Sequence, residues 1–320
     1  MATTRNSEVD YYKDMLRTNG FVSVDFGISG ADIDPLFAQF NELTDIAFQP
    51  DGSGKALIDA FHYTIPGRPN DADYYLTHRI KGDINPYNQT GISGTDEKYL
   101  AHVGPLTLAY AHSQLGRRMP IVMRRFIELC LVLHEEAKRS AEPVFRALGI
   151  ADALLAKDST EDIHMVRVLR YLGTQATYKA GLHFDRSVAT VAAWENKPGL
   201  VGAAGHNGHL RTLDIHEADH MAATATTTPI AHRSGQAKVF LGAGYQHLPT
   251  EHRDANAFMP LLLHGVINDT PGEERNAVVV FMNPHRFFKG YSVPNSAHET
   301  GFDEVRNYIL RRRPPHEDVA

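Results

Sequence analysis

The chain has a single cysteine, Cys130, among its 320 residues. One thiol cannot form an intramolecular disulfide, and it cannot build a cysteine-based zinc or iron–sulfur site. Cys130 lies in an apolar run, where we expect a buried structural thiol. The sequence therefore predicts a protein of the reducing cytoplasm that folds without a disulfide framework.

Long apolar segments and an excess of basic charge are also missing. No stretch approaches the roughly 18 consecutive apolar residues of a transmembrane helix, and the N-terminus has no apolar signal segment. A net charge of −6 gives no general electrostatic affinity for nucleic acid or membranes. We expect a small-molecule substrate, with no nucleic-acid or membrane partner and no protein partner evident.

The glycine motifs of nucleotide-binding enzymes are absent as well. The sequence has no P-loop, and Gly242-Ala243-Gly244 lacks the third glycine and the strand–helix context of a dinucleotide-binding turn. Histidine, in contrast, is abundant, at 18 residues. A short histidine motif therefore arises often by chance, and only its context makes it informative.

One such motif is a histidine followed two positions later by an acidic residue. It occurs at His134/Glu136, His183/Asp185, His252/Asp254 and His316/Asp318. The first pair falls in a predicted helix, where residues two apart point roughly 200° apart. The last two fall in a polar loop and in a terminal tail. His183 and Asp185 lead into an apolar strand, and residues two apart in extended chain share one face.

A third ligand would complete a metal site with that pair. His264 ends the apolar run Met259–His264, which reads as a buried strand, whereas His232, His247 and His252 lie in polar stretches. Two imidazoles and one carboxylate on a β-scaffold form the facial triad that holds non-haem Fe(II) and leaves other positions open. The alternative for each of these histidines is a solvated or hydrogen-bonded structural residue.

Arg275 begins the next apolar strand and needs an anion there. The anion is either the carboxylate of a dicarboxylate co-substrate, held in a bidentate grip, or an ordinary partner in Glu273 or Glu274. If the two strands pair as a hairpin across Asp269–Gly272, His264 and Arg275 become cross-strand neighbours, roughly 5 Å apart at Cα.

The hydrophobic pattern predicts an α-rich region over residues 1–155 and a β-rich region over residues 156–320, packed as one unit. The first has a strand after Gly20, a long looped stretch with short strands over residues 50–100, and three helices at Tyr11–Asn19, Ala31–Ile46 and Met119–Leu148, the last interrupted at Pro143. The second has short strands at His164–Tyr171, Val188–Trp194, His209–Ile215, Ala237–Leu241, Met259–Val266 and Asn276–Met282, then a helix at Phe302–Arg313. This spacing favours a mainly β, α+β fold with an antiparallel barrel or sandwich.

Four segments resemble, in order, the isopenicillin-N-synthase-like branch of the 2-oxoglutarate/Fe(II)-dependent dioxygenase superfamily. They are NGFVSVDFGISGADIDPLFAQF; Arg125–Ile150; VRVLRYLG with GLHFDRSVATV; and AKVFLGAG with LLLHGVINDTPGEERNAVVVFMNP. The resemblance implies a double-stranded β-helix, a distorted jelly roll, with an α-rich N-terminal region and supporting helices. It also implies an oxygenase with Fe(II), 2-oxoglutarate and O₂ that hydroxylates or otherwise oxidises a C–H bond of a natural product or amino-acid-derived molecule.

Residue by residue, the resemblance implies that His183, Asp185 and His264 are the iron ligands. Arg275 would bind the distal carboxylate of 2-oxoglutarate, and Tyr171 would hydrogen-bond the co-substrate. Asp185 argues against a halogenating variant, in which a small residue replaces the carboxylate.

Two departures from the family pattern leave alternatives open. Ala277 stands where the family has a serine, so one hydroxyl contact to the carboxylate is missing. The missing hydroxyl leaves open the alternative of an isopenicillin-N-synthase-like oxidase that does not use 2-oxoglutarate. In such an enzyme, Arg275 would bind a carboxylate of the substrate. A non-catalytic metal-binding barrel is the alternative from another class. The second departure is an insertion at residues 206–229, expected to shape the substrate entrance or act as a lid.

Three further residues are candidates for substrate binding. Tyr75, Arg79 and Lys81 lie in the stretch predicted as a loop, where they would face the mouth of the barrel and bind an anionic or amino-acid-like ligand. The alternative is a solvated loop.

Overall fold

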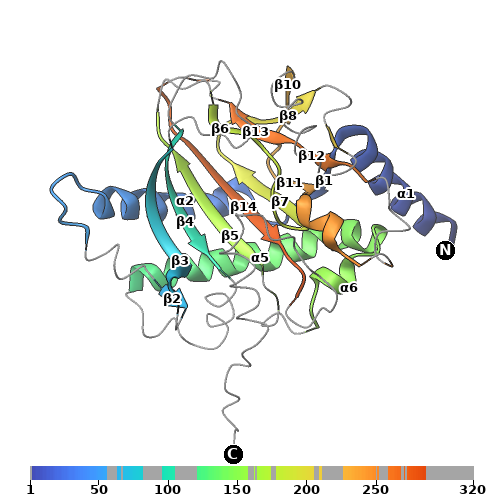
Figure 1. Cartoon of the computed structure of the whole chain (residues 1–320), viewed down its shortest axis with the longest axis horizontal. Coiled ribbons are helices and arrows are strands. Elements are labelled where there is room, and N and C mark those ends of the chain that lie inside the picture. The colour runs from blue at the N-terminus through green and yellow to red at the C-terminus, as the bar shows by residue number, and fades with distance from the viewer. Residues whose placement is uncertain are drawn as a thin grey trace, which may run out of the picture.

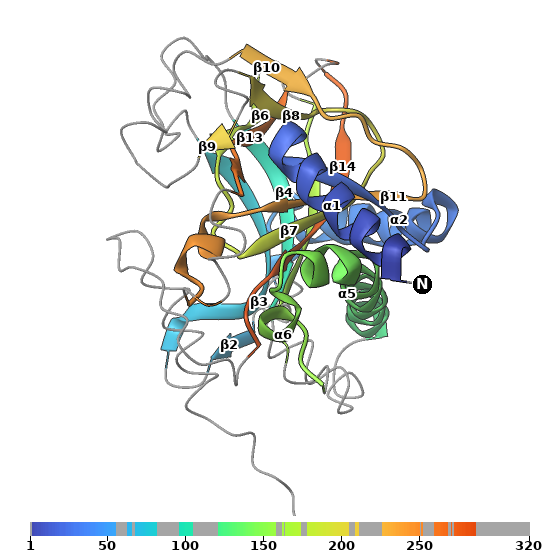
Figure 2. The same cartoon turned by 90° about the vertical axis from the view of Figure 1, so that its right-hand side faces the viewer.

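The computed structural model describes residues 2–55, 63–65, 68–81, 96–104, 121–157, 162, 164–173, 178–204, 209–210, 226–249, 251, 259–267, 270 and 272–285. Two antiparallel sheets face each other, and helices cover the outer face of the larger one (Figures 1 and 2). We call the space between the sheets the lumen.

The major sheet has eight strands in the order β1-β11-β7-β14-β5-β4-β3-β2. Their bounds are β1 (Phe21–Asp25), β2 (Tyr63–Ile65), β3 (Arg68–Lys81), β4 (Asp96–Val103), β5 (Met165–Tyr171), β7 (Ala189–Glu195), β11 (Gln236–Leu241) and β14 (Arg275–Met282). Strands from the first 155 residues and from the rest of the chain therefore pair within one sheet.

The minor sheet has the order β10-β8-β13-β6, and a separate two-stranded pair joins β12 to β9. Their bounds are β6 (Tyr178–His183), β8 (Leu200–Ala204), β9 (His209–Leu210), β10 (Thr226–Pro229), β12 (Leu261–Leu262) and β13 (His264–Ile267). Of the insertion at residues 206–229, only β9 and β10 are described, and the helix expected at Phe302–Arg313 lies outside the described residues.

The helices are α1 (Ala2–Asn19), α2 (Gly30–Ala47), α5 (Ile121–Ala147), α6 (Ala151–Leu154) and the 3₁₀ helix η4 (Ala243–His247). The apolar stripe of α2 is buried as predicted, and its Phe37 stacks on Trp194 of β7 with ring centroids 4.7 Å apart. Pro143 does not interrupt α5, which continues to Ala147. No helix in the described part of the chain is long and apolar enough to cross a membrane.

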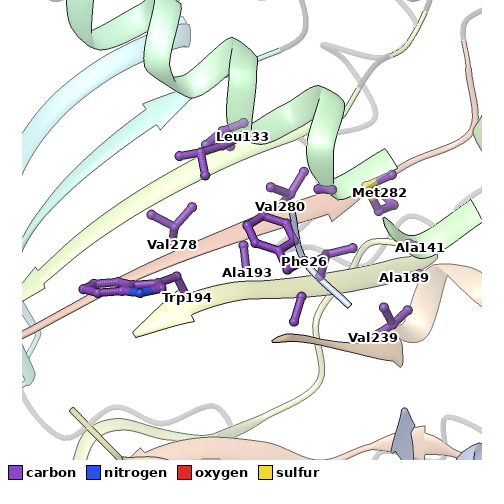
Figure 3. Packing of buried hydrophobic residues seen from close by; sticks show 14 of the residues in the cluster. Phe26, Leu133, Ala141, Ala189, Ala193, Trp194, Val239, Val278, Val280 and Met282 are labelled. Atoms are coloured by element: carbon purple, nitrogen blue, oxygen red, sulfur yellow. The ribbon is translucent and has the colours of Figure 1, made fainter. Parts of the chain in front are cut away.

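Alternation along the central strands separates two cores. On β5 and β14, alternate residues belong to the apolar cluster beneath the helices: Val166, Val168, Val278 and Val280. Figure 3 shows Val278 and Val280 on the side of β14 that faces a helix. The residues between them face the lumen, where Leu169 and Ala277 pack with Val266 of the minor sheet. The side of the sheet that faces the helices is thus an apolar core, whereas functional side chains can be placed on the side that faces the lumen.

Two predictions about the strands were wrong. The stretch at residues 50–100 was predicted to be looped with only short strands, but its strand β3 is 14 residues long and pairs with β4 in continuous register. His264 and Arg275 are not hairpin neighbours, because β13 belongs to the minor sheet and β14 to the major sheet. The chain crosses from one sheet to the other between them, as a jelly roll requires.

Cys130 is a free, fully buried thiol in α5, as predicted. Burial raises the pKa of this thiol, which keeps it protonated and unreactive.

Candidate active site

The strand pairing of the minor sheet brings two histidines together. His264, the first residue of β13, lies directly opposite His183, the last residue of β6. Asp185 Oδ1 is 3.5 Å from His183 Nε2, and Asp185 Oδ2 is 3.4 Å from His264 Nε2. Ligand atoms that each lie about 2.1 Å from one shared ion are spaced at roughly 3–3.5 Å. The three side chains, which we call the triad, therefore have the spacing of a metal-binding group.

The surroundings prepare the triad atoms for a cation. His264 Nδ1 lies 3.1 Å from the carbonyl oxygen of Leu262 and donates to it, which leaves the Nε2 lone pair free. Burial lowers the pKa of His264 to about 4, so its imidazole is neutral at neutral pH. Burial alone would raise the pKa of Asp185, but His264, His183 and the Thr190 hydroxyl, 2.6 Å away, together lower it. Neutral imidazoles and an ionised carboxylate are the forms that bind metal.

The backbone that carries Asp185 is held by η4. Ala243 N donates to the carbonyl oxygen of Asp185 at 2.7 Å, and Gly244 N donates to that of Ser187 at 3.1 Å. A Cβ at Gly242 would overlap both of these carbonyl oxygens. The Gly-Ala-Gly segment, which lacks the pattern of a nucleotide motif, thus permits close packing against the ligand loop.

A second group with ligand-like spacing lies between α5 and β5. It consists of His134, Asp162 and His164, all buried. Asn283 N donates to His164 Nδ1 at 3.1 Å, so the ring proton is on Nε2 and that atom has no lone pair for a metal. The ammonium group of Lys138 pairs with Asp162. These contacts indicate a buried polar contact between α5 and the sheet rather than a metal site.

Arg275 is buried and already has an anionic partner that the sequence analysis missed. Its Nη2 pairs with the carboxylate of Glu195, neither of the two glutamates expected, and its Nε donates to the carbonyl oxygen of Lys197 at 3.1 Å. Nη1 is buried without a hydrogen-bond partner among the described residues. Arg275 therefore has one donor ready for a carboxylate, and a bidentate grip requires Glu195 to leave Nη2.

Tyr171 lies in the row of residues that contains Arg275. It is directly opposite Arg275 on β14 and Lys98 on β4, and the two cations lie 5.2 Å and 5.1 Å from the centroid of its ring. Ala277 follows two positions along β14 on the same lumen face, where its methyl group joins an apolar cluster with Tyr171. The structure therefore gathers Arg275, Tyr171 and Ala277 on one wall of the lumen.

The three substrate-binding candidates lie on a strand rather than in a loop. Arg79 pairs with Lys98, and so extends the row of Tyr171, while Tyr75 pairs with His102 and Lys81 with Asp96. Their side chains lie outside the described residues, and their role stays a prediction.

The sequence signal for Glu195 was its place at the end of the strand VAAWE. A register shift between Ala192 and Trp194 places it on the lumen face, next to Ala277 across β7 and β14. Burial raises the pKa of Glu195, although Arg275 opposes that effect. The sequence shows an acidic residue at the end of this strand, but it shows neither the bulge that turns Glu195 to the lumen nor its partner 80 residues away.

No family model matches the chain, and no curated protein matches it. Solved structures do match. A Caulobacter crescentus protein placed in the 2OG-Fe(II) oxygenase family is 15% identical, with a TM-score of 0.59, over 92% of this chain and 88% of that one. The dioxygenase for auxin oxidation from rice is 16% identical, with a TM-score of 0.55, over 87% and 78% of the two chains. A full-length Neurospora crassa protein, solved in complex with alpha-KG, is 13% identical, with a TM-score of 0.55, over 94% and 90%.

At these identities the likeness establishes the fold. The chain shares the jelly-roll fold of these solved structures, which confirms the predicted fold class.

Proposed function

We propose that the protein is a non-haem Fe(II), 2-oxoglutarate-dependent oxygenase of the cytoplasm that oxidises a C–H bond of a small molecule. The observation that carries the proposal is the convergence of His183, Asp185 and His264 at the lumen of this fold. Structural neighbours support it: the Neurospora crassa protein was solved with alpha-KG and also with alpha-KG and thymine, a small molecule.

The triad would hold the iron from one side and leave further positions open for co-substrate and O₂. When bound, Fe(II) with 2-oxoglutarate and O₂ supplies the oxidising chemistry. Thr190 fixes the Asp185 carboxylate, and the carbonyl oxygen of Leu262 fixes the His264 ring. Arg275 Nη1 would bind the distal carboxylate beside Tyr171, and the apolar cluster around Leu169, Val266 and Ala277 would exclude water from that end of the lumen.

The second candidate is an isopenicillin-N-synthase-like oxidase that does not use 2-oxoglutarate. The observation that favours it is the Glu195–Arg275 pair, which leaves only part of the guanidinium for a carboxylate, together with Ala277 in place of a serine. In that case Arg275 Nη1 binds a carboxylate of the substrate itself.

The test is anaerobic addition of Fe(II) and then 2-oxoglutarate to the metal-free protein, followed by visible spectroscopy. We expect a weak charge-transfer band, because 2-oxoglutarate can chelate an iron held by so few protein ligands. The band should disappear in His264→Ala and require more 2-oxoglutarate in Arg275→Gln, but not in Arg146→Gln, which removes an exposed charge on α5.

Tight iron binding without the band would reject the use of 2-oxoglutarate and favour the oxidase. Iron binding with no O₂ consumption across a panel of substrates would instead favour a non-catalytic metal-binding barrel.

A further inference from the structure

Arg167 lies on the lumen wall of β5, and the functions proposed above leave it without a role. It is directly opposite Val279 on β14 and His102 on β4. It alternates with Val166 and Val168, which pack toward the helices. Its side chain therefore belongs to the same face of the sheet as Arg275 and Tyr171.

The contacts of Arg167 lack an anion. Its guanidinium carbon lies 4.7 Å from the centroid of the Phe281 ring, and its Nε is buried without a hydrogen-bond partner among the described residues. The other arginines of these two strands, Arg170 and Arg275, each pair with a carboxylate. Arg167 has no ion pair within the described part of the chain, although a partly buried cation in an apolar setting favours one.

The neighbour His102 does not supply that charge, because an imidazole is neutral or cationic. Burial, with a smaller effect of Arg167, lowers the pKa of His102 to about 3, so the ring is neutral. The anion is therefore expected from outside the described protein.

A short chain of contacts connects Arg167 to the triad. Thr190, which donates to Asp185, lies directly opposite Phe281 across β7 and β14, and the Phe281 ring contacts Arg167. Neighbouring strands are about 4.8 Å apart, so β5 lies roughly 10 Å from β7. A molecule that contacts Arg167 can thus extend over Phe281 toward the triad.

We propose that Arg167 binds the carboxylate of the primary substrate, which is a carboxylic acid with an apolar body; this rests on the proposed function. A guanidinium binds a carboxylate through strong charge-assisted hydrogen bonds. The wall beside it is apolar, with Phe281, Leu169 and Leu100. The separation from the triad places the oxidised C–H bond several bonds away from the carboxylate.

The test compares matched acids and amides as ligands. The pairs are phenylacetate with phenylacetamide and octanoate with octanamide, titrated by calorimetry into protein saturated with Fe(II) and 2-oxoglutarate under anaerobic conditions, and again into metal-free protein. Saturating 2-oxoglutarate occupies Arg275, so the remaining preference reports on Arg167. We expect each acid to bind about ten- to a hundredfold more tightly than its amide.

Three variants assign the preference to Arg167. Arg167→Gln should abolish it, while Arg167→Lys, which keeps the charge and guards against loss of folding, should retain part of it. Arg146→Gln removes an exposed arginine of α5 and should change nothing. Thermal unfolding of each variant verifies that it is folded.

The proposal is overturned if no acid binds, if amides bind as tightly as acids, or if the preference survives in Arg167→Gln. The titrations do not depend on turnover, so they are separate from the proposed function. If acids bind more tightly than amides but the 2-oxoglutarate band is absent, the co-substrate is rejected and the carboxylate site at Arg167 is kept. If the band appears but acids bind no more tightly than amides, the co-substrate is kept and the site at Arg167 is rejected.

Discussion

At the scale of single residues, Asp185 and Asp162 are both buried carboxylates with two histidines nearby, and their partners differ. Asp185 receives a hydrogen bond from Thr190 and has no ammonium or guanidinium partner among the described residues. Asp162 pairs with Lys138, and burial raises the pKa of Asp162. A cation that approaches Asp162 would have to displace Lys138, so only Asp185 is arranged for a metal ion.

We therefore expect Asp185→Asn to weaken Fe(II) binding by more than about a hundredfold. Loss of a residue that only hydrogen-bonds to a metal ligand already lowers metal affinity by about ten- to a hundredfold. Asp162→Asn is the matched control and should keep the affinity of the unmodified protein. Metal titration with a competing chelator measures both. Equal losses in the two variants would contradict the assignment of the triad.

Glu195 should set the affinity for the co-substrate, because its carboxylate competes with that of 2-oxoglutarate for Arg275. Glu195→Gln should bind 2-oxoglutarate about tenfold more tightly. In this variant no carboxylate of the protein competes for Arg275 Nη2, and one hydrogen bond to a charged group contributes about this much to affinity. Calorimetry in the presence of Fe(II) tests this. Weaker binding in the variant would show instead that Glu195 positions Arg275 for its ligand.

The same pair predicts a pH dependence with a defined sign. Burial raises the pKa of Glu195, so its neutral form becomes more populated as the pH falls toward that value. Neutral Glu195 no longer competes as an anion, so 2-oxoglutarate should bind more tightly as the pH falls toward the pKa of Glu195 and less tightly above it. Glu195→Gln should remove this dependence. A slope that persists in the variant would assign it to another group.

At the scale of elements, the ligand loop depends on a helix that contributes no ligand. The backbone of η4 holds the carbonyl oxygen of Asp185, and Gly242 leaves no space for a Cβ. Gly242→Ala should therefore displace the loop and lower Fe(II) affinity by about ten- to a hundredfold, as loss of an outer partner does.

Gly30→Ala is the control for that change. A Cβ at Gly30 would lie 3.5 Å from Trp194 Nε1, an ordinary contact, and Gly30 is remote from the triad in sequence. Chelator competition should show unchanged iron affinity in this variant. Unchanged affinity in Gly242→Ala as well would mean that the loop tolerates the displacement.

The elements also show what the sequence could predict. Helix α2 and strands β5, β7 and β14 were predicted within a few residues because each buries a periodic apolar face. The length of strand β3, RPNDADYYLTHRIK, was not predicted, because many of its residues favour turns, so the sequence indicated only short strands within a loop, and its extended conformation comes from pairing with β4.

Long-range partners were the other limit. His183, Asp185 and His264 were predicted as a group from context and resemblance, and the structure brings them within ligand spacing. The predicted hairpin between His264 and Arg275 was wrong. In sequence, two apolar strands joined by a turn give the same pattern whether they pair within one sheet or lie in two facing sheets. Glu195 as the partner of Arg275 depends on that same topology.

At the scale of the whole molecule, a metal in the triad would tie β6 and β13 of the minor sheet to the loop that enters β7 of the major sheet. Binding to the native state alone should stabilise the protein by about 2.7 kcal/mol at a hundred times the dissociation constant. Thermal unfolding with Fe(II) and with a chelator under anaerobic conditions measures this effect. It should be absent in Asp185→Asn, and equal stabilisation there would locate the metal elsewhere.

The division of the major sheet into a helix face and a lumen face has a consequence for how this protein can change. Substitutions at Val166 or Val168 act on the packing core, whereas substitutions at Arg167 or Leu169 act on the wall that meets a ligand. Mutational tolerance should therefore alternate along β5 with a period of two. Arg167 is only partly buried, so a library randomised at that position should retain more folded proteins than one randomised at Val166 or Val168, and it would sample new chemical preferences at a smaller loss of stability.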